Sequence, residues 1–169
     1  MNAPTPEADL LAAAHAIADR IVAIRRDMHR HPEPGFREHR TAGRIEEELA
    51  RIGGWRVRRV AGTGVIAEIG PATAPAIMLR ADIDALELTE ETGAEYASTV
   101  PGMMHACGHD GHTAMLLGAA ELISARAAGL GHRIRLVFQP CEETCPGGAL
   151  SMIEAGALEA AEAAVGLHV

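Results

Sequence analysis

Apolar residues near the start of the chain are spaced as in a long amphipathic helix. Thr5 and Pro6 are typical of a helix start, an N-cap residue followed by proline at the first helical position. Apolar residues then recur every three or four positions until Pro32, which disfavours helix in the residue before it. A second helix is expected to end at Gly53 and Gly54. The inward positions of the two helices are Leu10, Ala14, Ile17, Ile21, Ile24 and Met28, then Thr41, Ile45, Leu49 and Ile52.

Short apolar runs separated by glycine and proline follow, and they predict strands alternating with helices. The expected strands are residues 56–60, 65–69, 77–79, 134–138 and 163–169, the first two joined by a hairpin-like connection. The expected helices run from about Met115 to Gly129 and over residues 147–155, with a polar loop over 87–101. This order predicts an α/β fold, a layered mixed sheet flanked by helices.

Length and composition narrow the class of protein. The 169 residues are enough for one domain with a real core, and 48% of them are hydrophobic. The formal charge of −8 argues against a nucleic-acid partner, because such a partner requires a basic patch. Three cysteines do not form a secreted disulfide framework. No signal peptide or membrane span is recognisable, so we expect a cytoplasmic protein without a membrane partner.

A cluster of polar side chains between the loop and the third helix is the strongest functional signal. His105, Cys107, His109, Asp110 and His112 lie within eight positions. If residues 105–109 are extended, the first three side chains share a face and offer thiolate and imidazole ligands suited to zinc and its transition-metal neighbours. A lone histidine or cysteine is more often a packing residue, but the cluster favours a site. We expect Cys107 and His109 to bind metal and Asp110 to orient a neighbour, whereas His105 and His112 could equally be packing or substrate-side residues.

Carboxylates follow two of the expected strands. Asp82 and Asp84 lie at the carboxyl end of one strand, where open α/β sheets bind ligands, although Asp84 could equally cap a loop. Glu142 and Glu143 follow residues 134–138, and adjacent side chains in an extended or loop backbone point in roughly opposite directions. One glutamate could then bind metal while the other faces a substrate and carries a proton, which is the division of roles that a metal-dependent hydrolase needs.

Five motifs together resemble the M20 metallopeptidases, most closely the amidohydrolase branch that includes hippurate hydrolase, N-acyl-amino-acid hydrolases and auxin-conjugate hydrolases. The similarity runs from about Arg25 to the last residue. The motifs are Arg-Arg-Asp-Met-His-Arg-His-Pro-Glu from Arg25, Arg-Ala-Asp-Ile-Asp-Ala-Leu from Arg80, residues 104–118, Phe-Gln-Pro-Cys-Glu-Glu from Phe138 and Gly-Leu-His-Val from Gly166. Their shared order makes a chance match implausible.

The resemblance implies a zinc-peptidase-like catalytic domain with two divalent metal ions, zinc or manganese first and cobalt or nickel as alternatives. It implies an N-acyl amino acid or related small amide as substrate. By position, it makes Glu142 the general base and Asp82 a carboxylate that supports the metal site. The metal ligands that it implies are Cys107, His109, Glu143 and His168.

The chain also departs from the family pattern. Residues 1–169 correspond to the N-terminal portion of the catalytic domain, without the inserted domain that forms homodimers and a lid in full-length relatives, and without a further histidine ligand. Cys141 replaces the usual alanine, Glu87 stands where proline is common, and Thr144-Cys145-Pro146 interrupts a usually glycine-rich turn. We therefore expect weak or absent turnover from this chain alone.

Two alternatives remain beside the metal-dependent amidohydrolase. One is a truncated, non-catalytic metal-binding paralogue. The other is a thiol hydrolase with Cys107 as nucleophile and His109 or His105 as base. The thiol hydrolase ranks lowest, because it leaves Glu142, Glu143 and His168 without roles.

Overall fold

The helices on the N-terminal side follow the apolar spacing closely. A computed structural model describes residues 6–169, so the expected N-cap Thr5 lies outside the described residues. Helix α1 spans Pro6–Arg30 and α2 spans His39–Ile52, which confirms both predictions. Gly53 ends α2 with φ of 80°, a backbone conformation that glycine adopts without steric cost. Within the described range, no helix has both the length and the apolar character needed to cross a bilayer.

Five strands form one mixed sheet in the order β1-β2-β4-β3-β5. β2 pairs antiparallel with β1 and with β4, whereas β3 runs parallel to β4 and β5. The expected mixed sheet flanked by helices is therefore confirmed. The strands are β1 Arg56–Val60, β2 Gly64–Ile69, β3 Ala76–Asp82, β4 Arg133–Gln139 and β5 Ala161–Gly166.

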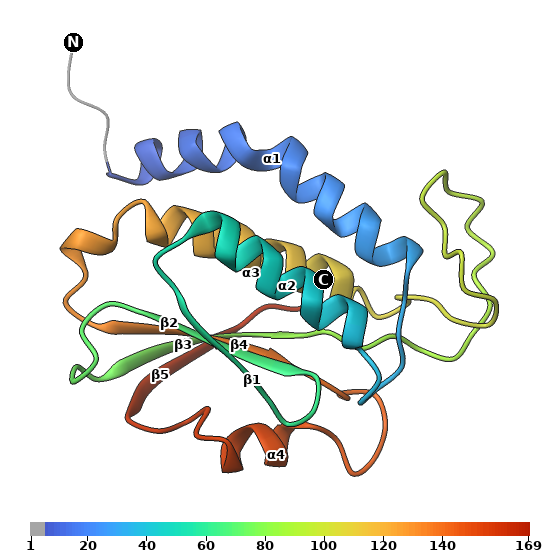
Figure 1. Ribbon diagram of the computed structural model, residues 1–169. Coiled ribbons are helices and arrows are strands. Elements are labelled where there is room, and N and C mark those ends of the chain that lie inside the picture. The colour runs from blue at the N-terminus through green and yellow to red at the C-terminus, as the bar shows by residue number, and fades with distance from the viewer. Residues whose placement is uncertain (1–5) are drawn as a thin grey trace.

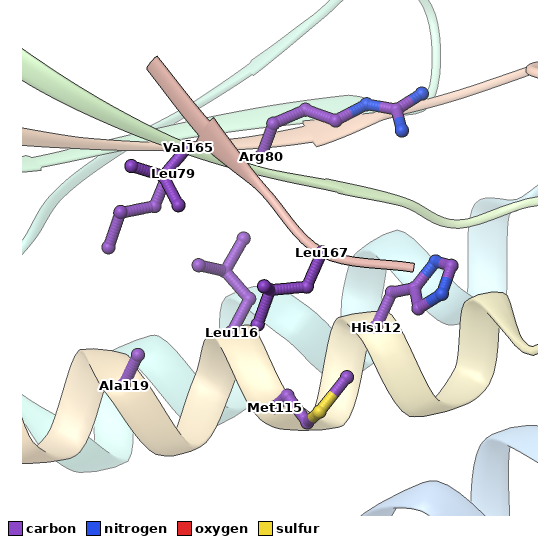
Figure 2. Close-up of a pocket in the computed structure, with 8 residues that line it drawn as sticks. All are labelled: Leu79, Arg80, His112, Met115, Leu116, Ala119, Val165 and Leu167. Carbon is purple, nitrogen blue, oxygen red and sulfur yellow. The ribbon is translucent and has the colours of Figure 1, made fainter. Parts of the chain in front are cut away.

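The helices cover the sheet unequally (Figure 1). α1, α2 and α3 (His109–Ser124) lie on one face, and the short α4 (Ala149–Glu154) lies on the other. Leu117 of α3 and Leu136 of β4 are fully buried in the main core, between the helices and the sheet. Beside it, an apolar pocket of about 110 Å³ lies between α3 and the segment that includes Val165 and Leu167 (Figure 2).

Two stretches differ from the sequence prediction. Residues 105–109 are not extended: they form a turn in which Gly108 has φ of 83°, and α3 begins directly after it at His109. The first turn of α3 is polar yet buried, so apolar spacing cannot reveal it. The helix ends at Ser124, and a separate 3-10 turn covers Ala127–Gly129. β5 ends at Gly166, so His168 lies beyond the strand rather than in it.

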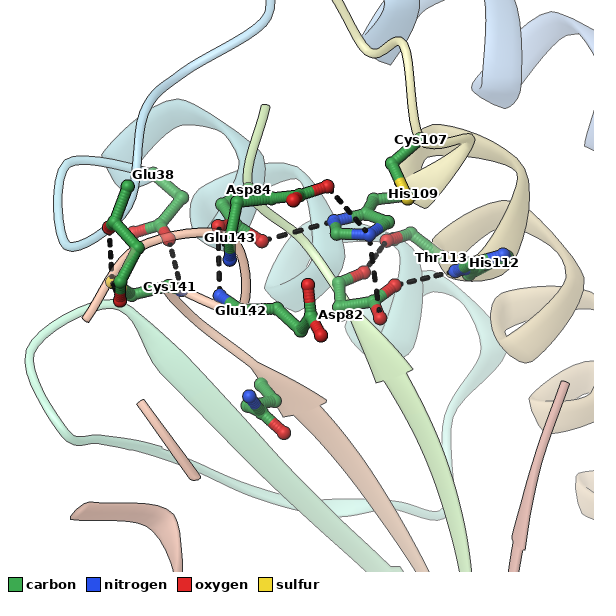
Figure 3. A network of polar contacts seen from close by, with 12 residues as sticks. Glu38, Asp82, Asp84, Cys107, His109, His112, Thr113, Cys141, Glu142 and Glu143 are labelled. Atoms are coloured by element: carbon green, nitrogen blue, oxygen red, sulfur yellow. Dashed lines mark hydrogen bonds and ion pairs between the residues drawn. The ribbon is translucent and has the colours of Figure 1, made fainter. Parts of the chain in front are cut away.

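The three parallel strands bring distant segments to one edge of the sheet. Asp82 of β3 is in register with Gln139 of β4, and Arg80 of β3 is in register with Gly166 of β5. The residues that follow these strands therefore leave the sheet side by side, as expected at the carboxyl edge of an α/β sheet. α3 starts near the same edge, which adds the His109 turn to it (Figure 3).

Leu117→Ala is expected to lower the free energy of unfolding by about 2–5 kcal/mol, because it leaves a cavity in the main core. Met115→Ala on the same helix is the matched control, since Met115 is 36% exposed, and it should cost well under half as much. Urea unfolding followed by circular dichroism measures both values. Equal losses in the two variants would contradict the placement of α3 against the sheet.

Candidate metal centre

One buried carboxylate, that of Asp84, joins three segments of the site. Its Oδ1 lies 3.0 Å from Nδ1 of His109, and its Oδ2 accepts the backbone N–H groups of Glu142 at 2.8 Å and Glu143 at 3.0 Å (Figure 3). Burial opposes ionisation, but the hydrogen bond from His109 and those from the backbone outweigh it and hold the pKa of Asp84 below its usual value. Asp84 therefore does cap a loop, the one that carries Glu142 and Glu143, and this loop is part of the candidate site.

His109 presents one free nitrogen to the centre. Because ionised Asp84 accepts a hydrogen bond from Nδ1, that nitrogen carries the proton. Among the described residues, the buried Nε2 has no hydrogen-bond partner. Burial alone would lower the pKa of His109, but the hydrogen bond to Asp84 and the neighbouring carboxylates raise it. An imidazole fixed through Nδ1 with an open Nε2 is the usual arrangement of a metal-binding histidine.

The implied metal ligands converge on His109. Sγ of Cys107 lies 3.4 Å from Nε2 of His168, and the ligand atoms of these two residues and of His109 lie within 4.8 Å of one another. Oε1 of Glu143 is buried, has no hydrogen-bond partner in the described part of the chain and lies 3.6 Å from Nε2 of His109. Together with Glu142, these donors supply one thiol, two imidazoles and two carboxylates, a set that fits divalent transition metals.

The two adjacent glutamates do not point in opposite directions. Glu142 and Glu143 each bring a carboxylate oxygen within 4.8 Å of a ring nitrogen of His109. The expectation fails because the backbone here is a tight turn: Cys141 has φ of 48°, and Asp84 binds both following N–H groups. The side chains still differ in setting, because Glu142 is exposed and Glu143 is half-buried.

Asp82 faces the centre but does not hold Nδ1 of His109. Its Oδ2 lies 3.6 Å from Nε2 of His109 and accepts a hydrogen bond from Arg80 at 2.7 Å, while its Oδ1 lies 2.5 Å from Nδ1 of His112. Asp84 makes the orienting contact with His109 instead. The spacing of two residues between the aspartates was the available signal, because it places both on one face of an extended segment.

Two other members of the cluster over residues 105–112, Asp110 and His105, lie apart from the candidate metal ligands. Asp110 accepts from His29 at 2.7 Å and pairs with Arg25 at 2.6 Å, so the neighbour that it orients belongs to α1. His105 is buried, and burial lowers its pKa to about 4. It lines a pocket of about 300 Å³ that also includes Cys107 and Tyr96.

The electrostatics around Cys107 disfavour a nucleophilic thiol. Burial, followed by the hydrogen bond and charge of Glu143, raises the pKa of Cys107 to about 11. Reactive catalytic cysteines have a lowered pKa, because the thiolate is the nucleophile. Carboxylates that disfavour an isolated thiolate attract a divalent cation, so this setting suits a metal ligand better than a nucleophile.

Comparison with known proteins identifies the family of the chain. The model of the family described as "Peptidase family M20/M25/M40" matches residues 78–169, more than half of the chain. The chain belongs to this family. The IAA-amino acid hydrolase ILR1-like 4 of Arabidopsis thaliana is 46% identical over 94% of the chain. The N-acyl-L-amino acid amidohydrolase of Geobacillus stearothermophilus is 43% identical over 88% of it.

A solved structure extends the M20 comparison to the fold. The YXEP protein of Bacillus subtilis, described as a dinuclear metal binding peptidase from the M20 family, superposes with a TM-score of 0.84 at 43% identity and covers 91% of the chain. The chain spans only 36%, 40% and 44% of the lengths of the Arabidopsis, Geobacillus and Bacillus subtilis proteins, respectively. These relatives therefore establish the family and the fold of this chain. They do not establish the activity of the whole protein.

The raised pKa of Cys107 predicts slow labelling of this thiol. Below its pKa of about 11 the metal-free thiol is protonated and unreactive, whereas Cys145 is exposed. At pH 7.5, iodoacetamide should modify Cys145 at least about tenfold faster, and the Cys107 rate should rise as the pH approaches 11. Peptide mass spectrometry of timed samples measures both rates. If Cys107 reacts faster than Cys145 at pH 7.5, the result would favour the alternative that the protein is a thiol hydrolase.

Proposed function

We propose that this chain forms the main part of the metal centre of an M20 amidohydrolase that cleaves the amide bond of N-acyl amino acids. The observation that carries the proposal is His109, whose Nδ1 is fixed by Asp84 and whose buried Nε2 has no hydrogen-bond partner among residues 6–169 and lies 3.6 Å from Oε1 of Glu143. Ligand atoms of Cys107 and His168 lie within 4.8 Å of a ring nitrogen of His109. A buried imidazole nitrogen without a partner is costly unless a ligand satisfies it.

The residues that would hold divalent metal are Cys107, His109, Glu143 and His168, with Asp82 facing them. When bound, divalent metal polarises an amide carbonyl and lowers the pKa of water. Two ions are proposed because a relative in the family is described as a dinuclear metal binding peptidase. The mixture of a thiol with imidazoles and carboxylates favours zinc or manganese, with cobalt or nickel as alternatives.

Glu142 is proposed as the general base. It is exposed where a substrate can approach, while its backbone N–H is fixed by Asp84. Its carboxylate takes a proton from the attacking water as the oxygen bonds to the carbonyl carbon. It then passes the proton to the nitrogen as the C–N bond breaks, so that a carboxylic acid and an amine are released. Glu143 is less suited to this role, because its Oε1 is buried beside His109.

The substrate class rests on the relatives. Their names specify N-acyl-L-amino acids, N-acetylcysteine and IAA-amino acids, which share an amide between an acyl group and an amino acid. A non-catalytic metal-binding protein is the second candidate. It has the same donors and differs only in lacking turnover.

The test combines metal content with hydrolysis of N-acetyl and N-benzoyl amino acids. Glu142→Gln should keep the bound metal but lower kcat by roughly 10²–10⁴-fold, because it removes the proton carrier and spares the ligands. His109→Ala should lose the metal as well as the activity. Metal content is measured on this chain, and hydrolysis is compared in whichever form of the protein turns over, this chain or a longer one. Elemental analysis and an amine-release assay give the two readouts, and Glu154→Gln, a change of exposed carboxylate on α4, is the matched control.

Each outcome separates the candidates. Turnover that survives removal of the metal by a chelator would contradict the metal-dependent mechanism. Metal that is retained in His109→Ala would place the centre elsewhere. Bound metal without hydrolysis, in this chain and in any longer form of the protein, would favour the non-catalytic protein.

A further inference from the structure

His168 reaches the candidate centre from a weakly anchored position. It is exposed and lies beyond β5, a strand at the edge of the sheet. Its Nε2 lies 3.4 Å from Sγ of Cys107, and its ring meets the ring of His112 edge-on, with centroids 4.8 Å apart. The precision of this ligand therefore depends on what holds the backbone after Gly166.

His112 holds that backbone. The N–H of Val169, the residue after His168, donates to Nε2 of His112 at 3.0 Å. A backbone N–H can only donate, so Nε2 of His112 must be the unprotonated nitrogen. The proton is then on Nδ1, which donates to Oδ1 of Asp82 at 2.5 Å. Both ring nitrogens of His112 are therefore hydrogen-bonded to other residues of the protein.

Asp82 is itself held by a hydrogen bond from Arg80. Arg80 donates to Oδ2 of Asp82 at 2.7 Å, and the same guanidinium donates to the side-chain oxygen of Gln139 at 2.9 and 3.1 Å. Asp82 and His112 are buried, and they belong to β3 and α3. The hydrogen bond to Val169 is thus anchored to two rigid elements of the core.

Packing at Gly108 fits the same arrangement. A Cβ at Gly108 would lie 2.9 Å from Cγ2 of Val169, closer than side chains tolerate. The turn that carries Cys107 and His109 therefore accommodates the Val169 side chain, while His112 binds the Val169 backbone. Val169, the residue directly after His168, is therefore contacted through both its side chain and its backbone.

We propose that His112 is a positioning residue that fixes His168 at the metal centre through the N–H of Val169. The proposal rests on the metal centre proposed above and gives a role to a histidine whose two ring nitrogens both bond within the protein. Asp82 fixes the orientation and the tautomer of the His112 ring, and Arg80 in turn holds Asp82.

Two variants of similar size separate this role from simple packing. In His112→Asn the short side chain can still donate to Asp82 but cannot reach Val169. In His112→Gln the longer side chain can accept from Val169, at the position of Nε2. Zinc affinity is expected to fall roughly 10- to 100-fold in His112→Asn and to stay within about threefold of wild type in His112→Gln. A purely structural role, satisfied by the bond to Asp82, gives the reverse order and would overturn the proposal.

A double-mutant cycle shows whether His112 acts through His168. His168→Ala should weaken zinc binding, and adding His112→Asn to it should cause little further loss, because the group being positioned is already gone. Fully additive losses would mean that His112 acts elsewhere, for example on His109. In the cobalt-substituted protein, the thiolate-to-cobalt absorption should persist in His112→Asn, since Cys107 still binds.

Nuclear magnetic resonance of the metal-free chain keeps this test separate from the proposed function. The Val169 amide should be protected from exchange in wild type and in His112→Gln but not in His112→Asn, with unfolding midpoints used to correct for stability. If wild type binds none of zinc, manganese, cobalt and nickel, the proposed function fails, while the Val169 protection still decides whether the contact exists. Equal protection in all three proteins would refute the positioning role.

Discussion

The geometry of the site depends on the buried Asp84 carboxylate. An ionised carboxylate removed from water costs several kcal/mol unless donors surround it. The donors here are the His109 ring and two successive backbone N–H groups, and they come from the start of α3 and the end of β4. Satisfying this one charge therefore fixes the tautomer of the histidine and the turn that carries Glu142 and Glu143. Loss of any donor would leave the others holding an under-solvated charge.

The strand order explains why Asp84 can reach those partners. β3 lies directly between β4 and β5 and is parallel to both, so the chain leaves all three strands at the same edge. The strand order could not be predicted from the sequence. The sequence did predict strands over residues 77–79 and 134–138, followed by Asp82 and Asp84 and by Glu142 and Glu143, respectively. The helices α1 and α2 were equally predictable, since Pro32 and Gly53 mark their ends.

The remaining features depend on contacts between residues far apart in the sequence. His109 starts a helix because Gly108 turns the chain, but the buried polar first turn hides that helix from apolar spacing. Asp84 and Asp82 are equivalent by spacing, and only the three-dimensional partners separate the one that holds His109 from the one that holds His112. The bond from Val169 to His112 involves a backbone N–H, which no side-chain pattern can reveal.

The density of acidic groups explains why the centre favours a cation. Oxygens of Asp82 and Glu143 each lie 3.6 Å from Nε2 of His109, so two carboxylates face one imidazole nitrogen, with Glu142 beside them. Carboxylates this close repel one another in a partly buried setting, and the raised pKa values of His109 and Cys107 have these charges among their causes. A divalent cation at the same place offsets the repulsion directly. Because such a cation binds the folded arrangement and not the dispersed ligands of the unfolded chain, its binding free energy adds to the stability of the fold that assembles the site.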